Sequence, residues 1–460
     1  MSERVLPEGW VDTTLGQVVE YGKAEKATPE QVDDDTWVLE LEDIEKSSSR
    51  IIQRLHFSER QFKSTKNRFK KGDVLYGKLR PYLDKVVIAE RDGVCTTEVV
   101  PLDARPNLDN RYLFYWLKSL GFLSYVNEVG YGVNMPRLGT KDGKAAPFVL
   151  APQEEQKAIA DKLDKLLAQV NNLKARLDAI PAILKRFRQS VLAKAVSGKL
   201  SEDWRGCSSR YVGGFPEEWG QESFSSLGEL ARGKSKHRPR NDPRLFGDKH
   251  PFIQTGEVAN ACGVISASEK YYSDFGLSQS RLFPKGTLCV TIAANIADTA
   301  LLGIDACFPD SVVGFVPDDA KCDVNFVKLL IDVNKAKLEA FAPATAQKNI
   351  NLKVLNSLSF PMPSLEEQTE IIRRVDQLFA FADQTEQQVA NAQARVDKLT
   401  QSILAKAFRG ELTAEWRAEN PELIGGEHSA EALLERIRAE KAKQKPTKTR
   451  RGGRKATVTP

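Results

Sequence analysis

A long segment of this 460-residue chain occurs twice. Residues 154–205 align without a gap on residues 366–417, and the triplet Glu-Glu-Gln opens both copies. Over the last seventeen residues of each copy, 189–205 and 401–417, ten positions are identical, whereas unrelated segments would share about one. Because copies of a repeat fold alike, the duplication constrains the architecture of the whole chain. The sequence therefore predicts two similar modules, each followed by one copy of the repeated segment.

Each copy of the repeat is predicted to form a long helix, because apolar residues recur at alternating spacings of four and three, the heptad pattern of a coiled coil. The first seam consists of Ile159, Leu163, Leu166, Val170, Leu173, Leu177, Ile180, Leu184, Phe187 and Val191. The second seam is weaker and consists of Ile371, Val375, Leu378, Ala382, Thr385, Val389, Ala392, Val396, Leu399 and Ile403. We expect an antiparallel coiled coil with a kink at Pro181. Two amphipathic helices in separate cores are the alternative.

The segments between the helices have a mixed pattern. Strand-like apolar runs occur at residues 86–89, 288–292 and 312–316, and helix-like stretches occur at 110–120 and 325–340. The predicted fold class is α+β, with two mixed α/β domains separated by the two paired helices in a pseudo-two-fold internal repeat. The predicted segments are a first mixed domain at 1–151, a helical spacer at 152–206, a second mixed domain at 207–362, a second spacer at 363–417, and a short helix with a basic, disordered tail at 418–460.

Composition indicates a globular protein without covalent or metal staples, since hydrophobic residues make up 41% and charged residues 28% of the chain. The six cysteines are scattered without a C-x-x-C pair, so neither a zinc site nor a disulfide framework is predicted. The sequence shows no membrane span or signal peptide, which favours the cytoplasm. The net charge of +5 does not identify a partner by itself. Basic residues nevertheless crowd the C-terminal tail at Lys441, Lys443, Lys445, Lys448, Arg450, Arg451, Arg454 and Lys455.

One motif is typical of an enzyme. Residues 228–235 match the phosphate-binding pattern G-x-x-x-x-G-K-[ST], and residues 329–332 resemble the Mg²⁺-binding strand that accompanies it. Such a loop requires a buried strand before the motif and a helix that starts at its lysine. Here a polar stretch precedes the motif, and Pro239 and Pro243 oppose a helix after Lys234. A P-loop nucleoside triphosphatase is kept as an alternative, but no other catalytic pattern is recognisable and the chain is predicted to be non-catalytic.

Basic, amide and aromatic side chains in glycine-rich stretches are candidates for contacts with DNA. Arginine and lysine can read guanine, asparagine and glutamine can read adenine, and most contacts of basic residues go to phosphates. In the first domain the candidates are Lys78, Arg80, Tyr131, Asn134 and Arg137. In the second domain they are Lys234, Lys236, Arg238, Arg240, Gln347, Lys348 and Asn349.

The repeated blocks resemble the two conserved regions of type I restriction-modification specificity (S, HsdS) subunits, with the enterobacterial type IA branch nearest. The resemblance is carried by the Glu-Glu-Gln triplets, by the heptad helix that ends at residues 189–195, and by the second copy through residue 413. It implies a subunit with two target-recognition domains that reads a bipartite, asymmetric sequence in double-stranded DNA. The two half-sites would be separated by a fixed, unspecified gap, and the helices would set that gap.

The resemblance also implies partners. In this family an S subunit joins two modification (M) subunits, which use S-adenosylmethionine, and two restriction (R) subunits, which use ATP and Mg²⁺. This chain is then expected to need no cofactor and no metal of its own. It is expected to dock the M subunits through Glu154, Glu155, Gln156, Glu366, Glu367 and Gln368. A coiled-coil scaffold that reads no DNA is the second alternative.

Overall fold

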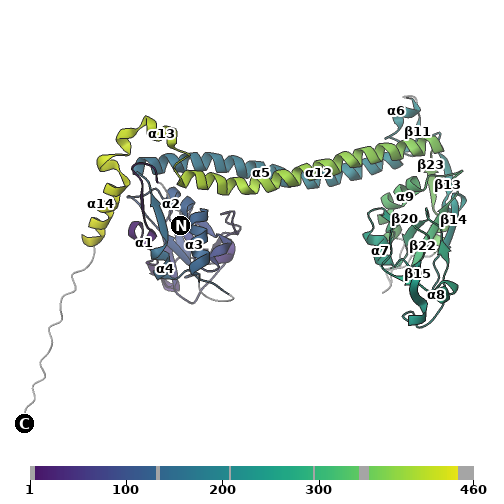
Figure 1. Ribbon diagram of the computed structural model, residues 1–460, viewed down its shortest axis with the longest axis horizontal. Coiled ribbons are helices and arrows are strands. Elements are labelled where there is room, and N and C mark those ends of the chain that lie inside the picture. Colours follow the sequence, from purple (N-terminus) through teal and green to yellow (C-terminus); the bar gives the residue numbers. More distant parts are fainter. Residues whose placement is uncertain (1–5, 131–134, 207–208, 294–295, 341–351, 444–460) are drawn as a thin grey trace, which may run out of the picture. The chain divides into compact units, whose positions relative to one another are not determined.

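A computed structural model of the chain describes residues 6–130, 135–206, 209–293, 296–340 and 352–443. The chain forms two compact units (Figure 1). Unit 1 comprises Met1–Asp178 and Asn391–Pro460, and unit 2 comprises Ala179–Ala390. The boundaries fall inside the two longest helices, α5 (Gln153–Val196) and α12 (Leu365–Phe408). Each unit therefore contains one mixed domain and part of both helices.

The first mixed domain lies in unit 1 and is built on small sheets. Strands β1 (Val11–Thr14) and β10 (Pro147–Leu150) pair antiparallel and join the two ends of the domain. A five-stranded sheet has the order β2 (Lys26–Ala27), β5 (Lys66–Phe69), β8 (Gly93–Cys95), β3 (Trp37–Leu39) and β4 (Leu55–His56). A three-stranded sheet has the order β7 (Val86–Ile88), β6 (Val74–Gly77) and β9 (Val99–Leu102).

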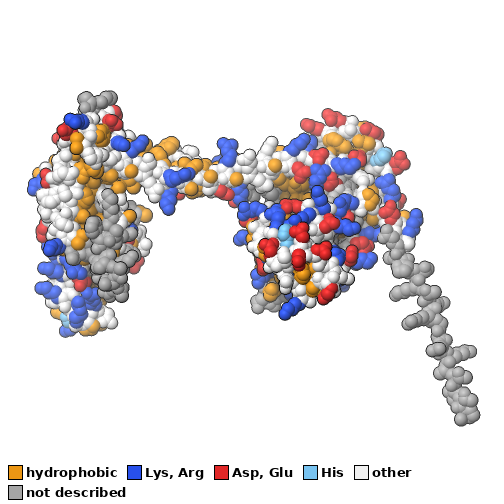
Figure 2. Space-filling view, turned by 180° about the vertical axis from the view of Figure 1, so that it is seen from behind, with side chains coloured by type: hydrophobic (Ala, Val, Ile, Leu, Met, Phe, Trp, Pro, Cys, Tyr) orange, Lys and Arg blue, Asp and Glu red, His pale blue; other side chains and the backbone are white. Residues whose placement is uncertain are grey.

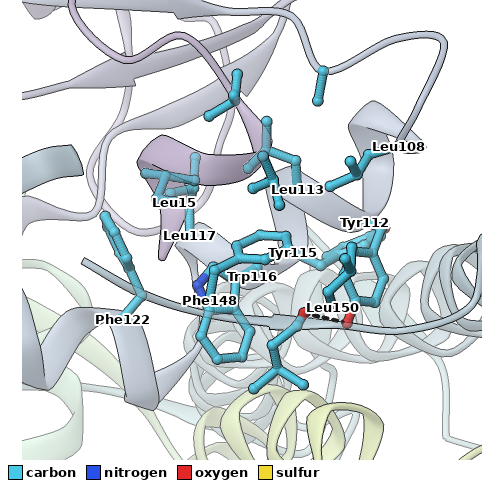
Figure 3. Close-up of a cluster of buried hydrophobic side chains, with 14 of the residues drawn as sticks. Leu15, Leu108, Tyr112, Leu113, Tyr115, Trp116, Leu117, Phe122, Phe148 and Leu150 are labelled. Atoms are coloured by element: carbon cyan, nitrogen blue, oxygen red, sulfur yellow. Dashed lines mark hydrogen bonds between the residues drawn. The ribbon is translucent and has the colours of Figure 1, made fainter. Parts of the chain in front are cut away.

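The α-helices in the described part of this domain are α1 (Leu15–Val18), α2 (Asn110–Leu117), α3 (Leu120–Val129) and α4 (Thr140–Ala145). Helix α2 begins where the Asp109 carboxylate accepts the backbone N–H of Arg111 and so caps the first turn. Its apolar face is buried in the core shown in Figure 3, where the Tyr112 hydroxyl donates to the Val149 carbonyl oxygen at 2.8 Å.

The end of α12 belongs to the same core. The Phe408 ring packs edge-on against the ring of Trp116, with centroids 5.0 Å apart. After α13 (Ala414–Glu419), helix α14 (Ala430–Lys443) buries Leu433, Leu434 and Ile437 in this core as well. The C-terminal segment is thus an integral part of unit 1 up to residue 443, and the expected disordered tail lies outside the described residues.

Unit 2 contains the second mixed domain. Its main sheet has the order β14 (Gly228–Arg232), β22 (Val312–Pro317), β19 (Leu288–Thr291), β20 (Thr299–Leu302) and β16 (Val264–Ile265). The described residues of this unit also form four strand pairs: β11 (Tyr211–Val212) with β12 (Phe215–Pro216), β13 (Gly220–Ser223) with β23 (Ser359–Met362), β15 (Phe246–Pro251) with β17 (Tyr271–Tyr272), and β18 (Leu282–Phe283) with β21 (Ala306–Cys307). The helices are α6 (Glu202–Arg205), α7 (Thr255–Asn260), α8 (Asp274–Ser278), α9 (Val324–Val333), α10 (Lys335–Ala340) and α11 (Leu352–Asn356).

The predicted strands and helices are confirmed. The apolar runs at 86–89, 288–292 and 312–316 form β7, β19 and β22. The helix-like stretch at 110–120 contains α2, and the stretch at 325–340 covers most of α9 and all of α10. The mixed α+β class is therefore correct for both domains. Within the described part of the chain, none of the helices combines the length and the apolar character that crossing a membrane requires.

Helices α5 and α12 pack antiparallel within each unit. In unit 1, Lys174 Nζ donates to Asp397 Oδ1 at 2.6 Å. In unit 2, Arg188 lies fourteen residues later in α5 and donates to Asp383, fourteen residues earlier in α12, at 2.6 Å. The register of the two helices is therefore the same in both units.

The seam between the helices is packed unevenly. Most of its positions are buried or half-buried, but Leu173 and Leu399 are each 42% exposed. Helix α5 continues through Pro181, so the proline does not end it. The predicted antiparallel coiled coil is confirmed, and the alternative of two separate cores is wrong because each unit holds both helices in contact.

Candidate functional site

In unit 1 the structure brings together the two glycine-rich stretches that the sequence offered separately. Directly after β6, Leu79 forms an antiparallel bridge with Arg137. The Arg80 N–H donates to the Pro136 carbonyl oxygen at 2.7 Å. Lys78, Arg80 and Arg137 consequently lie on one two-stranded pairing, which we call the first basic cluster.

The first basic cluster presents cations to solvent. The Arg80 side chain is exposed, and its backbone is in the left-handed region with φ of 51°. Arg137 Nε donates to Glu98 Oε2 at 3.2 Å. None of the residues that the structure describes accepts a hydrogen bond from the side chains of Lys78 or Arg80. Both cations are therefore without a hydrogen-bond partner among the described residues.

A buried ion pair supports the turn that carries Arg80. Asp84, also in the left-handed region with φ of 47°, accepts a hydrogen bond from Lys118 Nζ at 2.8 Å. Both side chains are 8% exposed, and burial raises the pKa of Asp84 above its ordinary value although the Lys118 ammonium opposes this. Removing one partner would leave a charge without compensation in the interior, so the pair fixes the turn. Sequence reasoning missed it, because the two residues are 34 positions apart and each is ordinary in its local context.

Unit 2 carries the second basic cluster, which follows β14. Its members are all exposed, namely Lys234, Lys236, Arg238 and Arg240. The Lys236 N–H donates to the Gln279 carbonyl oxygen at 3.2 Å, which holds the segment beside α8. Arg240 Nη2 donates to both carboxylate oxygens of Asp310, at 2.8 and 2.9 Å. Figure 2 shows Lys and Arg side chains gathered at the end of this unit that carries β15 and α8.

The structure does not describe five of the predicted contact residues. Those outside the described residues are Tyr131, Asn134, Gln347, Lys348 and Asn349.

The P-loop motif does not have the geometry of a phosphate-binding loop. Its first five residues form strand β14, which pairs with β22, and no helix begins at Lys234. The segment that resembled a Mg²⁺-binding strand lies in helix α9, where the two oxygens of Asp332 accept hydrogen bonds from Thr299 and Lys328. Across the described ranges no group of three His, Cys, Asp or Glu residues is placed to hold a metal ion.

The Glu-Glu-Gln triplet has a structural role in unit 1. Glu155 is fully buried, and its carboxylate accepts hydrogen bonds from Trp10 Nε1 at 2.7 Å, Thr413 Oγ1 at 2.6 Å and Arg417 Nη1 at 2.5 Å. The Arg417 guanidinium also donates to the Gly410 carbonyl oxygen at 2.6 Å. We call this arrangement the first clasp. It joins the start of the domain, the start of α5 and the segment after α12.

Unit 2 repeats the arrangement as the second clasp. The Glu367 carboxylate accepts hydrogen bonds from Ser201 Oγ at 2.7 Å, from Trp219 Nε1 at 3.1 Å and from Arg205. The Arg205 guanidinium also donates to the Gly198 carbonyl oxygen at 2.6 Å. The second clasp therefore joins the start of the second domain, the start of α12 and the segment after α5.

The glutamine side chain of each triplet accepts a hydrogen bond from the residue that caps the start of a neighbouring helix. Gln156 Oε1 accepts the Asp109 N–H at 3.2 Å beside the start of α2. Gln368 Oε1 accepts the Asp323 N–H at 2.7 Å beside the start of α9. Both glutamines are fully buried.

Burial of these side chains corrects the docking prediction for four of its six residues. Glu155, Gln156, Glu367 and Gln368 are at most 4% exposed and are hydrogen-bonded inside their units, so they offer no surface to another protein. The two remaining residues are exposed and are Glu154 and Glu366. Glu154 pairs with Lys157 at 2.7 Å in the first turn of α5.

Comparison with known proteins agrees with this architecture. The family model described as type I restriction modification DNA specificity domain matches residues 7–182 and 216–392, and each match spans one mixed domain and the first part of the helix that follows. The chain is 38% identical over 379 residues to the type I restriction enzyme EcoBI specificity subunit of Escherichia coli, covering 78% of this chain and 76% of that protein. It is also 38% identical over 379 residues to the EcoDI specificity subunit of Escherichia coli, covering 76% and 80%.

A solved structure has a similar fold. The crystal structure of the HsdS subunit from Thermoanaerobacter tengcongensis aligns with a TM-score of 0.63 and 19% identity, covering 89% of this chain and 99% of that one.

Proposed function

The chain belongs to the family of type I restriction-modification DNA specificity subunits, and from this premise we propose that it reads a bipartite, asymmetric DNA target. Each mixed domain would read one half-site, and an unspecified gap of fixed length would separate the two. In this proposal the chain performs no chemistry. It selects the place on the duplex at which partner subunits act.

The observation that carries this proposal is the repetition of one unit with different exposed clusters. Both units hold their domain to both helices through the same kind of clasp, formed around Glu155 in one and Glu367 in the other. The basic clusters differ in sequence and in local structure, since one is a two-stranded pairing and the other an irregular segment beside α8. Repeated supports with dissimilar contact surfaces are what two readers of different sequences require.

The exposed cations can supply both parts of DNA binding. Lys and Arg contacts to phosphates give affinity that falls with salt, and Arg or Lys contacts to guanine give sequence preference. Arg80 is the strongest candidate in unit 1, because its turn is fixed by the buried Asp84–Lys118 pair. Replacing Arg80 with Ala should relax one position of one half-site. An equal loss of affinity on all sequences would instead assign it to a phosphate.

The partners implied by the family supply the chemistry. We propose that this subunit joins two M subunits, which bind S-adenosylmethionine and methylate adenine, and two R subunits, which use ATP and Mg²⁺. The chain itself would hold no cofactor or metal. Its place of action would be the cytoplasm, where these partners and the DNA are found.

The gap length is tested by lengthening both helices together. Seven residues inserted between Leu173 and Leu184 of α5, with seven at the facing part of α12, add about 10 Å of helix at about 1.5 Å per residue. Because the base pairs of a duplex are about 3.4 Å apart, the gap should grow by about three base pairs with both half-sites unchanged. Mapping methylated adenines in cells that carry each variant measures this. Altered half-sites with an unchanged gap would contradict the proposal.

Modular reading is tested by exchanging one domain. Replacing residues 1–151 with the corresponding domain of a relative should change one half-site and leave the other intact. The matched exchange of residues 207–362 should change only the other half-site. A change in both half-sites after either exchange would contradict separate readers.

Docking of the M subunits is now proposed for the exposed Glu154 and Glu366 alone. Reversing both charges, Glu154→Lys with Glu366→Lys, should weaken co-purification with M. Asp35→Lys serves as the control, because the Asp35 side chain is 94% exposed and lies far along the sequence from either triplet. Undiminished co-purification of the double variant would remove these two residues from the docking surface.

The alternatives from the sequence are separated by simple measurements. The nucleoside triphosphatase is not supported, since the motif forms a strand without a following helix, and the purified chain should not bind ATP. A scaffold that reads no DNA would show equal affinity for all duplexes even with M present. The assembled complex should instead prefer its target over unrelated DNA.

A further inference from the structure

Arg244 in unit 2 is exposed and yet held in one orientation. It lies in the short turn Pro243–Leu245, between the second basic cluster and β15, and its side chain is 70% exposed. Asp242 accepts hydrogen bonds from Arg244 Nε at 3.2 Å and Nη2 at 2.8 Å, and from the Arg244 backbone N–H at 3.0 Å. One edge of the guanidinium is therefore fixed to a carboxylate two residues before it.

The carboxylate is itself held in place. The Asp242 side chain is only 12% exposed, and one of its oxygens lies 2.7 Å from His237 Nε2. Hydrogen bonds from Arg244, foremost, and from His237 keep the pKa of Asp242 well below its usual range. Asp242 is thus a fixed negative group that orients the arginine.

An aromatic ring fixes the plane of the guanidinium. Arg244 Cζ lies 5.4 Å from the centroid of the Phe275 ring, at the start of α8. The His237 ring packs edge-on against the same phenyl ring at 5.3 Å. Phe275 is 39% exposed, although a phenyl ring has no polar group to satisfy in water. The four side chains form one assembly at the surface, which we call the Arg244 assembly.

The free edge of this guanidinium matches guanine. A guanidinium has five N–H donors in a rigid fork, and the edge with Nε is taken by Asp242. The other edge presents one N–H of Nη1 beside one of Nη2, and no residue in the described ranges accepts a hydrogen bond from Nη1. Two parallel N–H donors fit the O6 and N7 acceptors of guanine in the major groove. Because the side chain is already oriented, binding would cost little conformational entropy.

We propose that Arg244 reads a guanine in the half-site of the second domain, with Asp242 and Phe275 as positioning residues. This inference rests on the proposed function and names one base contact within it. The surroundings support it, because the Arg244 assembly adjoins the second basic cluster through His237, which lies between Lys236 and Arg238. Phosphate contacts from those cations would hold the duplex against the assembly.

Arg54 provides a matched control. It makes the same edge-on pair with a carboxylate, donating from Nε and Nη2 to Glu90 at 2.9 and 2.8 Å. Its side chain is 43% exposed, but no aromatic ring of the described residues lies over its guanidinium, and it belongs to unit 1. Arg54→Ala therefore removes an exposed arginine of similar pairing without touching the Arg244 assembly.

The experiment uses the full chain assembled with its M partner. Methylated adenines are mapped to define both half-sites, and affinity is then measured by fluorescence anisotropy on duplexes with each base pair replaced in turn. For the wild type, the half-site of the second domain should contain a guanine whose replacement weakens binding roughly 5- to 150-fold. Arg244→Ala should abolish this preference at that position only. Arg54→Ala should leave the second half-site unchanged.

The positioning roles of Asp242 and Phe275 are tested by the same base preferences. Asp242→Asn and Phe275→Leu should reduce the guanine preference while the preferences at other positions stay as in the wild type. Arg244→Lys should retain affinity for phosphate but lose most of the preference, because lysine cannot donate the paired hydrogen bonds.

Three results would overturn the inference about Arg244. A uniform loss of affinity on all sequences after Arg244→Ala would make Arg244 a phosphate contact and overturn the inference. Unchanged base preferences after Arg244→Ala would also overturn it. The third such result is a half-site of the second domain that contains no guanine in either strand. Equal binding of all duplexes by the wild-type assembly would instead reject the proposed function itself.

Discussion

Removing the carboxylate of the first clasp should destabilise unit 1 strongly. Glu155→Ala leaves the Arg417 guanidinium, which is 14% exposed, without its counter-charge, and it deprives Trp10 Nε1 and Thr413 Oγ1 of their acceptor. Breaking a buried ion pair from one side costs about 3–5 kcal/mol. This cost already includes the loss of the acceptor for the two neutral donors, because all three hydrogen bonds end on the same carboxylate. The expected loss in the free energy of unfolding of unit 1 is therefore about 3–5 kcal/mol.

The neighbouring residue supplies the control. Glu154 is exposed and, among the described residues, pairs only with Lys157 in the same turn, so Glu154→Ala should change stability by no more than about 0.5 kcal/mol. Urea unfolding followed by tryptophan fluorescence measures both variants, and calorimetry should show the transition of unit 1 lowered by roughly 6–20 °C. Glu155→Gln, which keeps an acceptor oxygen, should fall between them. A Glu155→Ala variant within about 0.5 kcal/mol of the wild type would refute the reasoning.

Three further predictions test the repeat and the cores. Gly198 and Gly410 have positive φ, and an added Cβ would lie 2.5 Å and 2.3 Å from a proline ring, so replacing either with Ala should destabilise its own unit by at least about 1 kcal/mol in denaturant titrations. Among the described cysteines only Cys262 is exposed, whereas burial raises the pKa of Cys322 to about 12, so a thiol reagent at pH 8 should modify Cys262 in the native protein and leave Cys322 unmodified until denaturant is added. A chain that ends at residue 206 contains all of α5 but no part of α12. It should therefore form a dimer in which the two copies of α5 complete two clasps. A folded monomer in analytical ultracentrifugation would contradict this.

The helical part of the fold could be predicted because periodicity records which face is buried. Ile159 and Leu163 lie in the seam and are fully buried, as the heptad pattern requires. The register could not be predicted in the same way. It is marked by Lys174 with Asp397, which lie outside the seam and 223 positions apart, and many other pairs of charged residues would have been equally plausible from the sequence.

The candidate site could likewise be predicted only in part from the sequence. Composition located Arg80 and Arg137 in loops, but only the fold placed them on one pairing. The family resemblance implied that the repeated triplet docks the M subunits, whereas the structure buries Glu155, Gln156, Glu367 and Gln368. A signal for the opposite conclusion was present, since Trp10 recurs as Trp219 and Arg417 as Arg205 along with the triplet. A carboxylate, an indole and an arginine that repeat together indicate a shared buried contact.

Under the proposed function, the clasps require both helices to be altered together if the gap is to change. Within unit 1, Glu155 belongs to α5 and Arg417 follows α12, so the domain is fixed to both helices by buried contacts. Unit 2 fixes its domain to both helices in the same way through Glu367 and Arg205. An insertion in α5 alone therefore sets the seam out of register, and neither domain can follow one helix without giving up its bond to the other. Matched insertions in both helices leave both clasps intact, because Glu155, Arg417, Glu367 and Arg205 all lie outside the inserted turns.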